Sequence, residues 1–295
     1  MFISDDEVRG VLANEAWYSE NTITWPGAPT YQSAKSLAEK RSKQLKRRPR
    51  NRLAPDFWSQ VVGNCLLYCS ERNRCCLGGC PQCGAAVQRW LTYNIVQLAA
   101  QEPHGSVHAV SIASPYPLRK RLTSEVLGLP MAHAAVLAEV SGQVEWAVFC
   151  LDLSWNDYNA VSGSWPKSAA KSGWQPHVYG FVKATSIGAF KDAAKELLEP
   201  VRHTPLPIKV RPYDGSAYGA SYAFKTEFQR RVSYFDKSGT QNACDYRLPV
   251  ALSNEAIGQL SKLGHSNRIG LIGLEITKTF KIKREGVIAP NKTIH

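Results

Sequence analysis

Six of the eight cysteines lie between residues 65 and 83, and this cluster has the most readable chemistry in the chain. It ends in Cys80-Pro-Gln-Cys83, followed by Gly84. Two cysteines separated by two residues can place both thiolates on one tetrahedral ion, and the glycine permits a tight turn after them. Four protein ligands would leave no open position on the ion, so such a site is structural. The predicted zinc ligands are Cys69, Cys76, Cys80 and Cys83, with Cys75 and Cys65 as alternatives.

A second group of candidates surrounds a histidine in the segment GWQPHVYGFV, residues 173–182. If this segment is a strand, His177 and Tyr179 share one face, because side chains two residues apart on a strand point the same way. Asp152 ends the apolar run before it, with Asp157 as the alternative. A carboxylate in apolar surroundings needs a partner, which a metal ion would supply. Without such a partner, Asp152 would face water and His177 would be an ordinary core residue.

A third group contains two tyrosines and a lysine. We predict a helix over residues 215–235, with Phe224 and Phe228 on one stripe and Tyr222 and Lys225 on the roughly opposite one, together with Tyr218. A phenol with a pKa of about 10 is a weak nucleophile and needs activation. A lysine one turn further on can stabilise the charge of a phenolate or of a phosphate.

The order of predicted elements is that of a mixed α and β chain. Residues 1–34 read as an irregular arm, residues 35–52 as a basic segment broken at Pro49, and residues 269–276 as an apolar run among one or two helices. The predicted strands are 107–114, 144–153, 176–184 and 207–212; the predicted helices are 85–100, 118–140 with an interruption around Gly128 and Pro130, and 187–199; residues 154–173 are predicted to be a loop.

These motifs together resemble the HUH endonucleases that initiate rolling-circle replication. Their strand motif G-W-x-P-H-x-H, and its relative P-H-x-Q-G-F, is similar to the P-H-V-Y-G-F around His177, and Tyr222-Ala-Phe-Lys225 fits their Y-x-x-K. A cysteine cluster ending in C-P-x-C also precedes the catalytic domain in plasmid initiators. The resemblance covers residues 65–235, and it departs at Tyr179, where the family has His or Gln.

The resemblance implies an α+β fold, with an antiparallel sheet of about five strands flanked by helices and preceded by a small zinc-binding module. His177, Asp152 and Tyr179 would hold a catalytic Mg²⁺ or Mn²⁺. Tyr222 would attack a DNA phosphodiester with help from Lys225, and Tyr218 could be a second nucleophile. The expected domains are an arm (1–56), a zinc module (57–103), a nicking domain (104–236) and a helical extension (237–295).

Composition agrees with a polyanionic partner. The 295 residues carry a net charge of +12, and nine Lys or Arg residues fall within 35–52, where phosphate contact is the expected role. No apolar run reaches the roughly 18 residues of a membrane-spanning helix, and the acidic N-terminus does not resemble a signal peptide. We therefore expect a cytoplasmic protein, in a bacterium or a phage-infected cell. There is no G-x-x-x-x-G-K-[ST] motif, so any helicase would be a separate protein.

The leading hypothesis is therefore a DNA-nicking replication initiator that acts on single-stranded or hairpin DNA. A transposase with the same catalytic chemistry is the first alternative. A non-catalytic zinc-containing DNA-binding protein on a decayed HUH fold is the second, because Tyr179 stands at a ligand position. A zinc-containing RNA-binding protein would also suit the charge and the aromatic residues, but it leaves the tyrosine segment unexplained.

Overall fold

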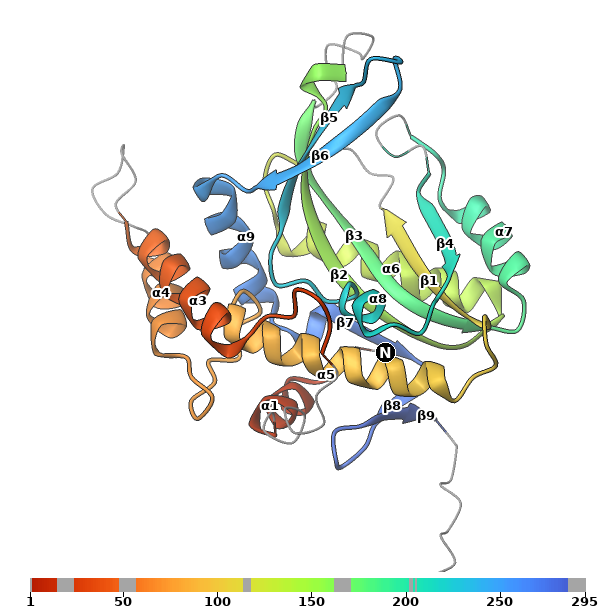
Figure 1. Cartoon of the computed structure of the whole chain (residues 1–295), viewed down its shortest axis with the longest axis horizontal. Helices are drawn as coiled ribbons and strands as arrows, with labels where there is room; N and C mark the ends of the chain where they lie inside the picture. The colour runs from red at the N-terminus through yellow and green to blue at the C-terminus, as the bar shows by residue number, and fades with distance from the viewer. Residues whose placement is uncertain are drawn as a thin grey trace, which may run out of the picture.

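The computed structural model describes residues 2–14, 24–47, 57–113, 118–161, 171–201, 204 and 206–285, and its fold is α+β (Figure 1). Pro49, and residues 162–170 of the predicted loop, lie outside the described residues. The elements are α1 (Asp5–Ala13), α3 (Tyr31–Lys46), α4 (Phe57–Tyr68), α5 (Pro81–Ala100), β1 (Val107–Ala113), α6 (Ser124–Ser141), β2 (Val144–Asp157), η1 (Asn159–Val161), β3 (Ser172–Ala184), α7 (Ile187–Leu197), β4 (Ile208–Pro212), α8 (Ala217–Ser221), β5 (Gln229–Phe235), β6 (Gln241–Arg247), α9 (Val250–Leu263), η2 (Ser266–Arg268), β7 (Ile269–Ile272), β8 (Leu274–Ile276) and β9 (Ile282–Arg284).

The main sheet has the strand order β4-β1-β3-β2-β5-β6, and β7 also pairs with β2. The long strand β2 is antiparallel to β3 along its whole length, and its first half is antiparallel to β7. Its last four residues pair with β5 in parallel. The prediction of an antiparallel sheet therefore holds for every pair of the main sheet except β2–β5. That pair is parallel because the chain leaves β4 at one edge and crosses to the far side of β2 through α8.

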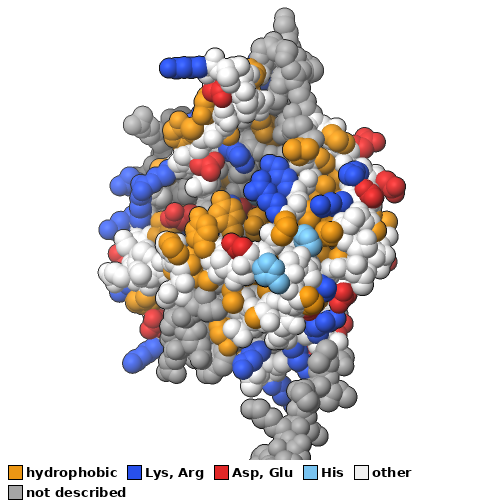
Figure 2. Space-filling view, turned by 45° about the vertical axis from the view of Figure 1, so that its right-hand side comes forward, with side chains coloured by type: hydrophobic (Ala, Val, Ile, Leu, Met, Phe, Trp, Pro, Cys, Tyr) orange, Lys and Arg blue, Asp and Glu red, His pale blue; other side chains and the backbone are white. Residues whose placement is uncertain are grey.

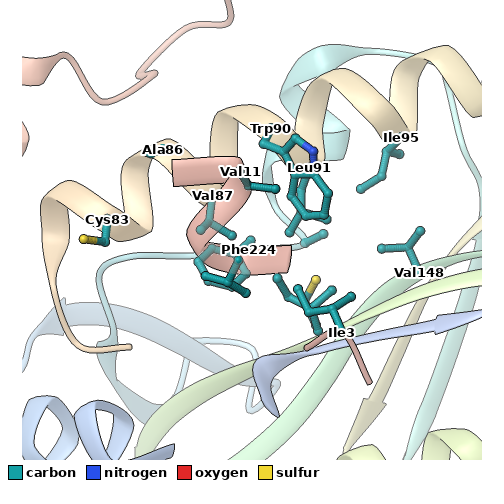
Figure 3. Packing of buried hydrophobic residues seen from close by; sticks show 14 of the residues in the cluster. Ile3, Val11, Cys83, Ala86, Val87, Trp90, Leu91, Ile95, Val148 and Phe224 are labelled. Carbon is teal, nitrogen blue, oxygen red and sulfur yellow. The ribbon is translucent and has the colours of Figure 1, made fainter. Parts of the chain in front are cut away.

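Helices cover both faces of the sheet, and alternate residues of β2 enter the two cores. Trp146 and Val148 pack with α5, where Trp90, Leu91 and Ile95 lie opposite the strands (Figure 3). Phe149 and Leu151 belong to the second core, which contains residues of α6, α7 and α9. β2 is thus the central strand that both helical layers share.

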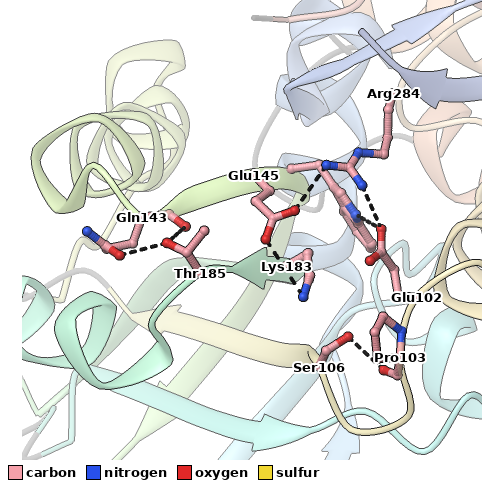
Figure 4. A network of polar contacts seen from close by, with 9 residues as sticks. Glu102, Pro103, Ser106, Gln143, Glu145, Lys183, Thr185 and Arg284 are labelled. Atoms are coloured by element: carbon pink, nitrogen blue, oxygen red, sulfur yellow. Dashed lines mark hydrogen bonds and ion pairs between the residues drawn. The ribbon is translucent and has the colours of Figure 1, made fainter. Parts of the chain in front are cut away.

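The two terminal segments are more ordered than their composition indicates. The predicted arm contains α1, which begins at a capping box in which Ser4 and Glu7 satisfy each other's backbone N–H groups. The predicted helical extension contains one long helix, α9, but also strands β6 to β9, because the apolar run pairs with β2 as β7. Arg284 of β9 binds Glu102 and Glu145, which ties the C-terminal hairpin to α5 and β2 (Figure 4). The division into four domains, with its three boundaries, remains a prediction.

Three internal elements also differ from expectation. The predicted strands 107–114, 176–184 and 207–212 and helices 85–100 and 187–199 are confirmed to within one to four residues. α6, however, runs through Gly128 and Pro130 without interruption, because Leu127, Met131 and Ala134 form a buried stripe on it. β2 extends to Asp157, since β3 and β5 both offer it backbone partners there.

The predicted helix over 215–235 is wrong beyond its first turns. α8 ends at Ser221, and residues 229–235 form β5. The spacing of Phe224, Phe228 and Val232 suits a helix, but the strand gains backbone hydrogen bonds from both β2 and β6. Tertiary pairing therefore overrides the local pattern.

Candidate functional site

A polar stripe begins on the sheet where the apolar packing against α5 stops. On this face of β2, buried Cys150 is followed by Asp152, Ser154 and Asn156. On β3, Phe181 is followed in the opposite direction by Tyr179, His177 and Gln175. The register places Asp152 directly opposite His177. The two residues that the sequence singles out as metal ligands therefore lie side by side.

Asp152 is the centre of this stripe and is only 1% exposed. Its Oδ2 lies 2.6 Å from Lys225 Nζ and 3.2 Å from His177 Nε2, and its Oδ1 accepts a hydrogen bond from the Leu153 N–H at 2.8 Å. Burial alone would raise the pKa of Asp152, but Lys225 and His177 more than offset that effect and hold it well below its usual range. The carboxylate is therefore a buried anion with two cationic or polar neighbours.

Lys225 reaches this carboxylate from the segment that follows α8. Phe224 is fully buried in the core that contains residues of α5, and Gln88 of α5 donates a hydrogen bond to the Ser221 carbonyl. The segment is therefore anchored to α5 on both sides of Tyr222. Burial would lower the pKa of Lys225, but Asp152 outweighs it and raises the pKa above its ordinary value. Lys225 therefore stays charged at neutral pH.

The two tyrosines of the third group differ in their contacts. Tyr222 caps the end of α8 and is 43% exposed, and its ring lies 4.2 Å from Lys225 Nζ and 5.6 Å from the Tyr179 ring. Tyr218 lies earlier on α8 and is 57% exposed. The structure thus places Tyr222 at the edge of the site. It lies in a turn that follows the short helix α8, and not within the long helix that was predicted.

Two other predicted residues have clear neighbours. Burial raises the pKa of Tyr179, so its side chain remains a neutral phenol beside Tyr222. Asp157, the alternative carboxylate, pairs with Arg230 at 2.6 Å and accepts hydrogen bonds from Asn159. Asp152 is therefore the carboxylate that His177 contacts, and Asp157 fixes the start of β5.

The convergent residues line a small pocket of about 180 Å³. Asp152, His177, Tyr179, Tyr222 and Lys225 all contribute to its wall. On the face shown in Figure 2, Lys and Arg side chains gather near the centre beside hydrophobic side chains. The wall of the pocket carries both signs of charge, because Lys225 and Arg231 lie there together with buried Asp152 and the exposed carboxylates Glu227 and Asp245.

Four cysteines form a second site, which could hold a metal ion such as zinc. Ligand atoms of Cys69, Cys75, Cys80 and Cys83 lie within 4.8 Å of one another. The sulfur atoms of Cys69 and Cys83 are 3.6 Å apart, and those of Cys75 and Cys83 are 3.9 Å apart. Four sulfurs about 2.3 Å from one tetrahedral zinc ion would be separated by about 3.8 Å, so the spacing fits.

Cys76 is not part of this group, and its selection over Cys75 as a ligand is wrong. Its backbone is in the left-handed region, with φ +57°, and its Sγ lies 3.7 Å from the Arg74 carbonyl oxygen. Adjacent residues in this turn point apart, so only one of the pair can enter the cluster. Cys65 is likewise outside the cluster.

Two buried arginines join the cysteine loop to the Lys225 segment, and sequence reasoning missed this role. Arg268 donates to the carbonyls of Gly78 and Lys225, both at 3.0 Å. Arg41 donates to Thr226 O at 3.0 Å and to Gly79 O at 3.4 Å. No sequence signal marks these two cations as buried.

No family model, curated protein or solved structure matches this chain. Within the described residues, no helix is long and apolar enough to cross a membrane.

Proposed function

We propose that this chain is a metal-dependent tyrosine endonuclease that nicks single-stranded DNA, as rolling-circle initiators of the HUH type do. The observation that carries this proposal is the convergence at Asp152. Side chains from β2, β3 and the segment after α8 meet there, and Asp152 and Lys225 are separated by 73 residues. A chance match to a short Y-x-x-K pattern would not be expected to place its lysine on the carboxylate that the same resemblance assigns as a metal ligand.

Tyr222 supplies the nucleophile in this proposal. Its phenol oxygen attacks the phosphorus, and the bond from phosphorus to the 3′ oxygen breaks. The leaving oxygen takes up a proton and becomes a 3′-hydroxyl, while the phosphate stays on Tyr222 as a 5′-phosphotyrosine. Lys225, whose Nζ already lies against the Tyr222 ring, would stabilise negative charge on the phenolate or the phosphate.

The donor set at Asp152 fits one side of a divalent ion. Asp152 offers a carboxylate oxygen, which suits Mg²⁺ or Mn²⁺ with water at the remaining positions, whereas the imidazole nitrogen of His177 is a ligand more typical of zinc, iron or copper. A bound ion would polarise the phosphate. Tyr179 stays a neutral phenol, so we assign it to packing against Tyr222 and not to the ligands. Lys225 contacts the same Asp152 oxygen, so an ion and Lys225 would compete for it.

The four-cysteine cluster would hold a structural zinc ion. Cys80 lies at the N-cap of α5 and Cys83 in its first turn, so the ion would fix the start of the helix that anchors the Lys225 segment. DNA is the proposed partner, bound through exposed Lys and Arg side chains, and a separate helicase would open duplex DNA.

Covalent capture tests the proposal. The protein is incubated with labelled single-stranded oligonucleotides that span the DNA beside its own gene, with Mn²⁺, and resolved on a denaturing gel. We expect a covalent band that is lost in Tyr222→Phe and retained in Tyr218→Phe, the matched control on the same helix. Binding of the same oligonucleotides without any covalent band would contradict the nuclease.

A non-catalytic DNA-binding protein is the second candidate, and one observation favours it. Tyr179 is a neutral phenol at a position where HUH enzymes have a metal ligand, and Lys225 pairs with the carboxylate that an ion would need. If this candidate is correct, the gel shows bound but unmodified protein with and without Mn²⁺.

A further inference from the structure

The polar stripe continues beyond Asp152 into a second, larger pocket. Its volume is about 520 Å³, and it lies between the sheet and the β5–β6 hairpin, with walls from β1, β2, β3, β5 and β6. Pockets of roughly 300–1,000 Å³ hold small organic ligands in proteins. His177 and Ser154 line both pockets, so a molecule that fills the second one lies next to the proposed scissile phosphate.

The floor of this pocket is a chain of buried polar side chains. Asn156, Gln175 and Thr204 are 4%, 8% and 5% exposed. The Asn156 Nδ2 donates to Gln175 Oε1, and the Gln175 Nε2 donates to the Thr204 hydroxyl. Asn156 Oδ1 is buried and has no hydrogen-bond partner among the residues that the structure describes. An unpaired buried acceptor is unfavourable, and a ligand that brings a hydrogen-bond donor into the pocket would satisfy it.

The charge on the pocket wall points to an anionic ligand. Lys209 and Arg231 are the two permanently charged residues among the described wall residues, and none of those residues is acidic. A nucleotide of adenine, guanine or cytosine combines the two features that this pocket would bind, because its phosphate is an anion and its base carries an exocyclic amino group. Amide side chains are also the groups that proteins use to read base edges.

We infer that this pocket holds one nucleotide of the DNA strand, next to the phosphodiester that Tyr222 attacks, and that Asn156 selects its base. Asn156 Oδ1 accepts a hydrogen bond from an exocyclic amino group. The pocket therefore favours a base with such a group over thymine or uracil, which have a carbonyl oxygen in its place. This inference rests on the proposed function, because it takes single-stranded DNA as the substrate.

Binding of two homopolymers tests the selection without any variant. Deoxycytidine and deoxyuridine homopolymers of about 20 nucleotides differ at base position 4, an amino group against a carbonyl, and at the protonation of the adjacent N3. Fluorescence anisotropy is measured with both, without added divalent ions so that no cleavage intervenes. We expect the deoxycytidine polymer to bind about tenfold more tightly.

Variants then test whether Asn156 causes the preference for the deoxycytidine polymer. Asn156→Leu should bring the two affinities within about twofold of each other, mainly by weakening the deoxycytidine polymer. Thr204→Val, which removes the hydroxyl at the far end of the chain, should reduce the preference without abolishing it. The matched control is Asn267→Leu at an exposed asparagine, which should keep the full preference. Thermal melting shows that each variant is folded.

The outcomes separate the two proposals. Equal binding of the two polymers by the wild-type protein overturns the inference alone, provided that Tyr222 still forms its covalent band. A preference that survives in folded Asn156→Leu also overturns it. If neither polymer binds although Tyr222 forms its covalent band, the inference alone fails; if the covalent band is absent as well, the DNA-nicking proposal and the inference both fail.

Discussion

Replacement of Arg268 with methionine should loosen the junction between the cysteine loop and the Lys225 segment. Arg268 is 1% exposed, and its two terminal nitrogens donate to Gly78 O and Lys225 O at 3.0 Å each. Its guanidinium also lies 4.1 Å from the Phe224 ring. Methionine is flexible and apolar, so it can fill much of the space but cannot replace either hydrogen bond.

The expected magnitude follows from two opposing effects. Two buried carbonyls lose a charged donor, at about 1–3 kcal/mol each. Against this, burial lowers the pKa of Arg268 to about 10, although Cys150 and Asp152 work in the other direction, which shows that the cation is held at a cost. Replacing the buried cation with an apolar side chain therefore recovers part of the free energy that its desolvation costs. We expect a net loss of about 2 kcal/mol in the free energy of unfolding.

Urea unfolding followed by circular dichroism measures this loss, with Arg247→Met as the control at an exposed arginine on β6. Arg268→Lys should recover only part of it, because one ammonium group cannot reproduce the forked contact with both carbonyls. An Arg268→Met variant within about 0.5 kcal/mol of the wild type would refute the reasoning, since surface substitutions typically fall in that range.

Three further predictions concern other parts of the chain. Cys75→Ser should abolish zinc retention, measured by elemental analysis, whereas Cys76→Ser should keep about one ion per chain. The pKa of Asp152 is below its unfolded value, so its stabilising contribution is present above about pH 4 and is lost in acid. The stability difference between the wild type and Asp152→Asn, from urea unfolding, should therefore narrow between about pH 6 and about pH 3. Gly180→Ala should destabilise the sheet by at least about 2 kcal/mol, because a Cβ there would lie 2.2 Å from a backbone oxygen, whereas Gly128→Ala in α6 should stabilise the chain by about 0.5–1 kcal/mol. Equal effects of the two glycine variants, or effects with the signs reversed, would contradict the packing.

The sequence indicated which face of each strand carries the site residues, because successive side chains of a strand point to opposite faces. This geometry places Asp152 on the face of Cys150 and His177 on the face of Tyr179, and strands that follow each other in the chain often pair. Two residues in register on adjacent strands then lie close together whatever the loop between them does. The face that each residue occupies therefore follows from local geometry, whereas the pairing of Asp152 with His177 was implied by the resemblance and is set in the structure by the register of β2 against β3.

The route of Tyr222 into the site could not be derived in the same way. Phe224, Phe228 and Val232 fit a helical stripe as well as they fit an anchor followed by a strand. The decision depends on the unpaired edge at the end of β2, which β5 occupies in parallel. Sequence spacing does not show which edge a distant segment will meet. The motifs therefore indicated that Lys225 and Asp152 share a site, but not the backbone that brings them together.

The sequence also does not show which positively charged side chains are buried. Arg41 belongs to the basic run assigned to phosphate contact, yet it is buried and donates to the Thr226 carbonyl. Arg268 does the same for Lys225 from the other side. Composition counts these two arginines with the exposed cations, although they hold the cysteine loop against the proposed active site. The link between the metal cluster and the Asp152 pocket is thus made by residues whose charge, taken alone, would be assigned to DNA.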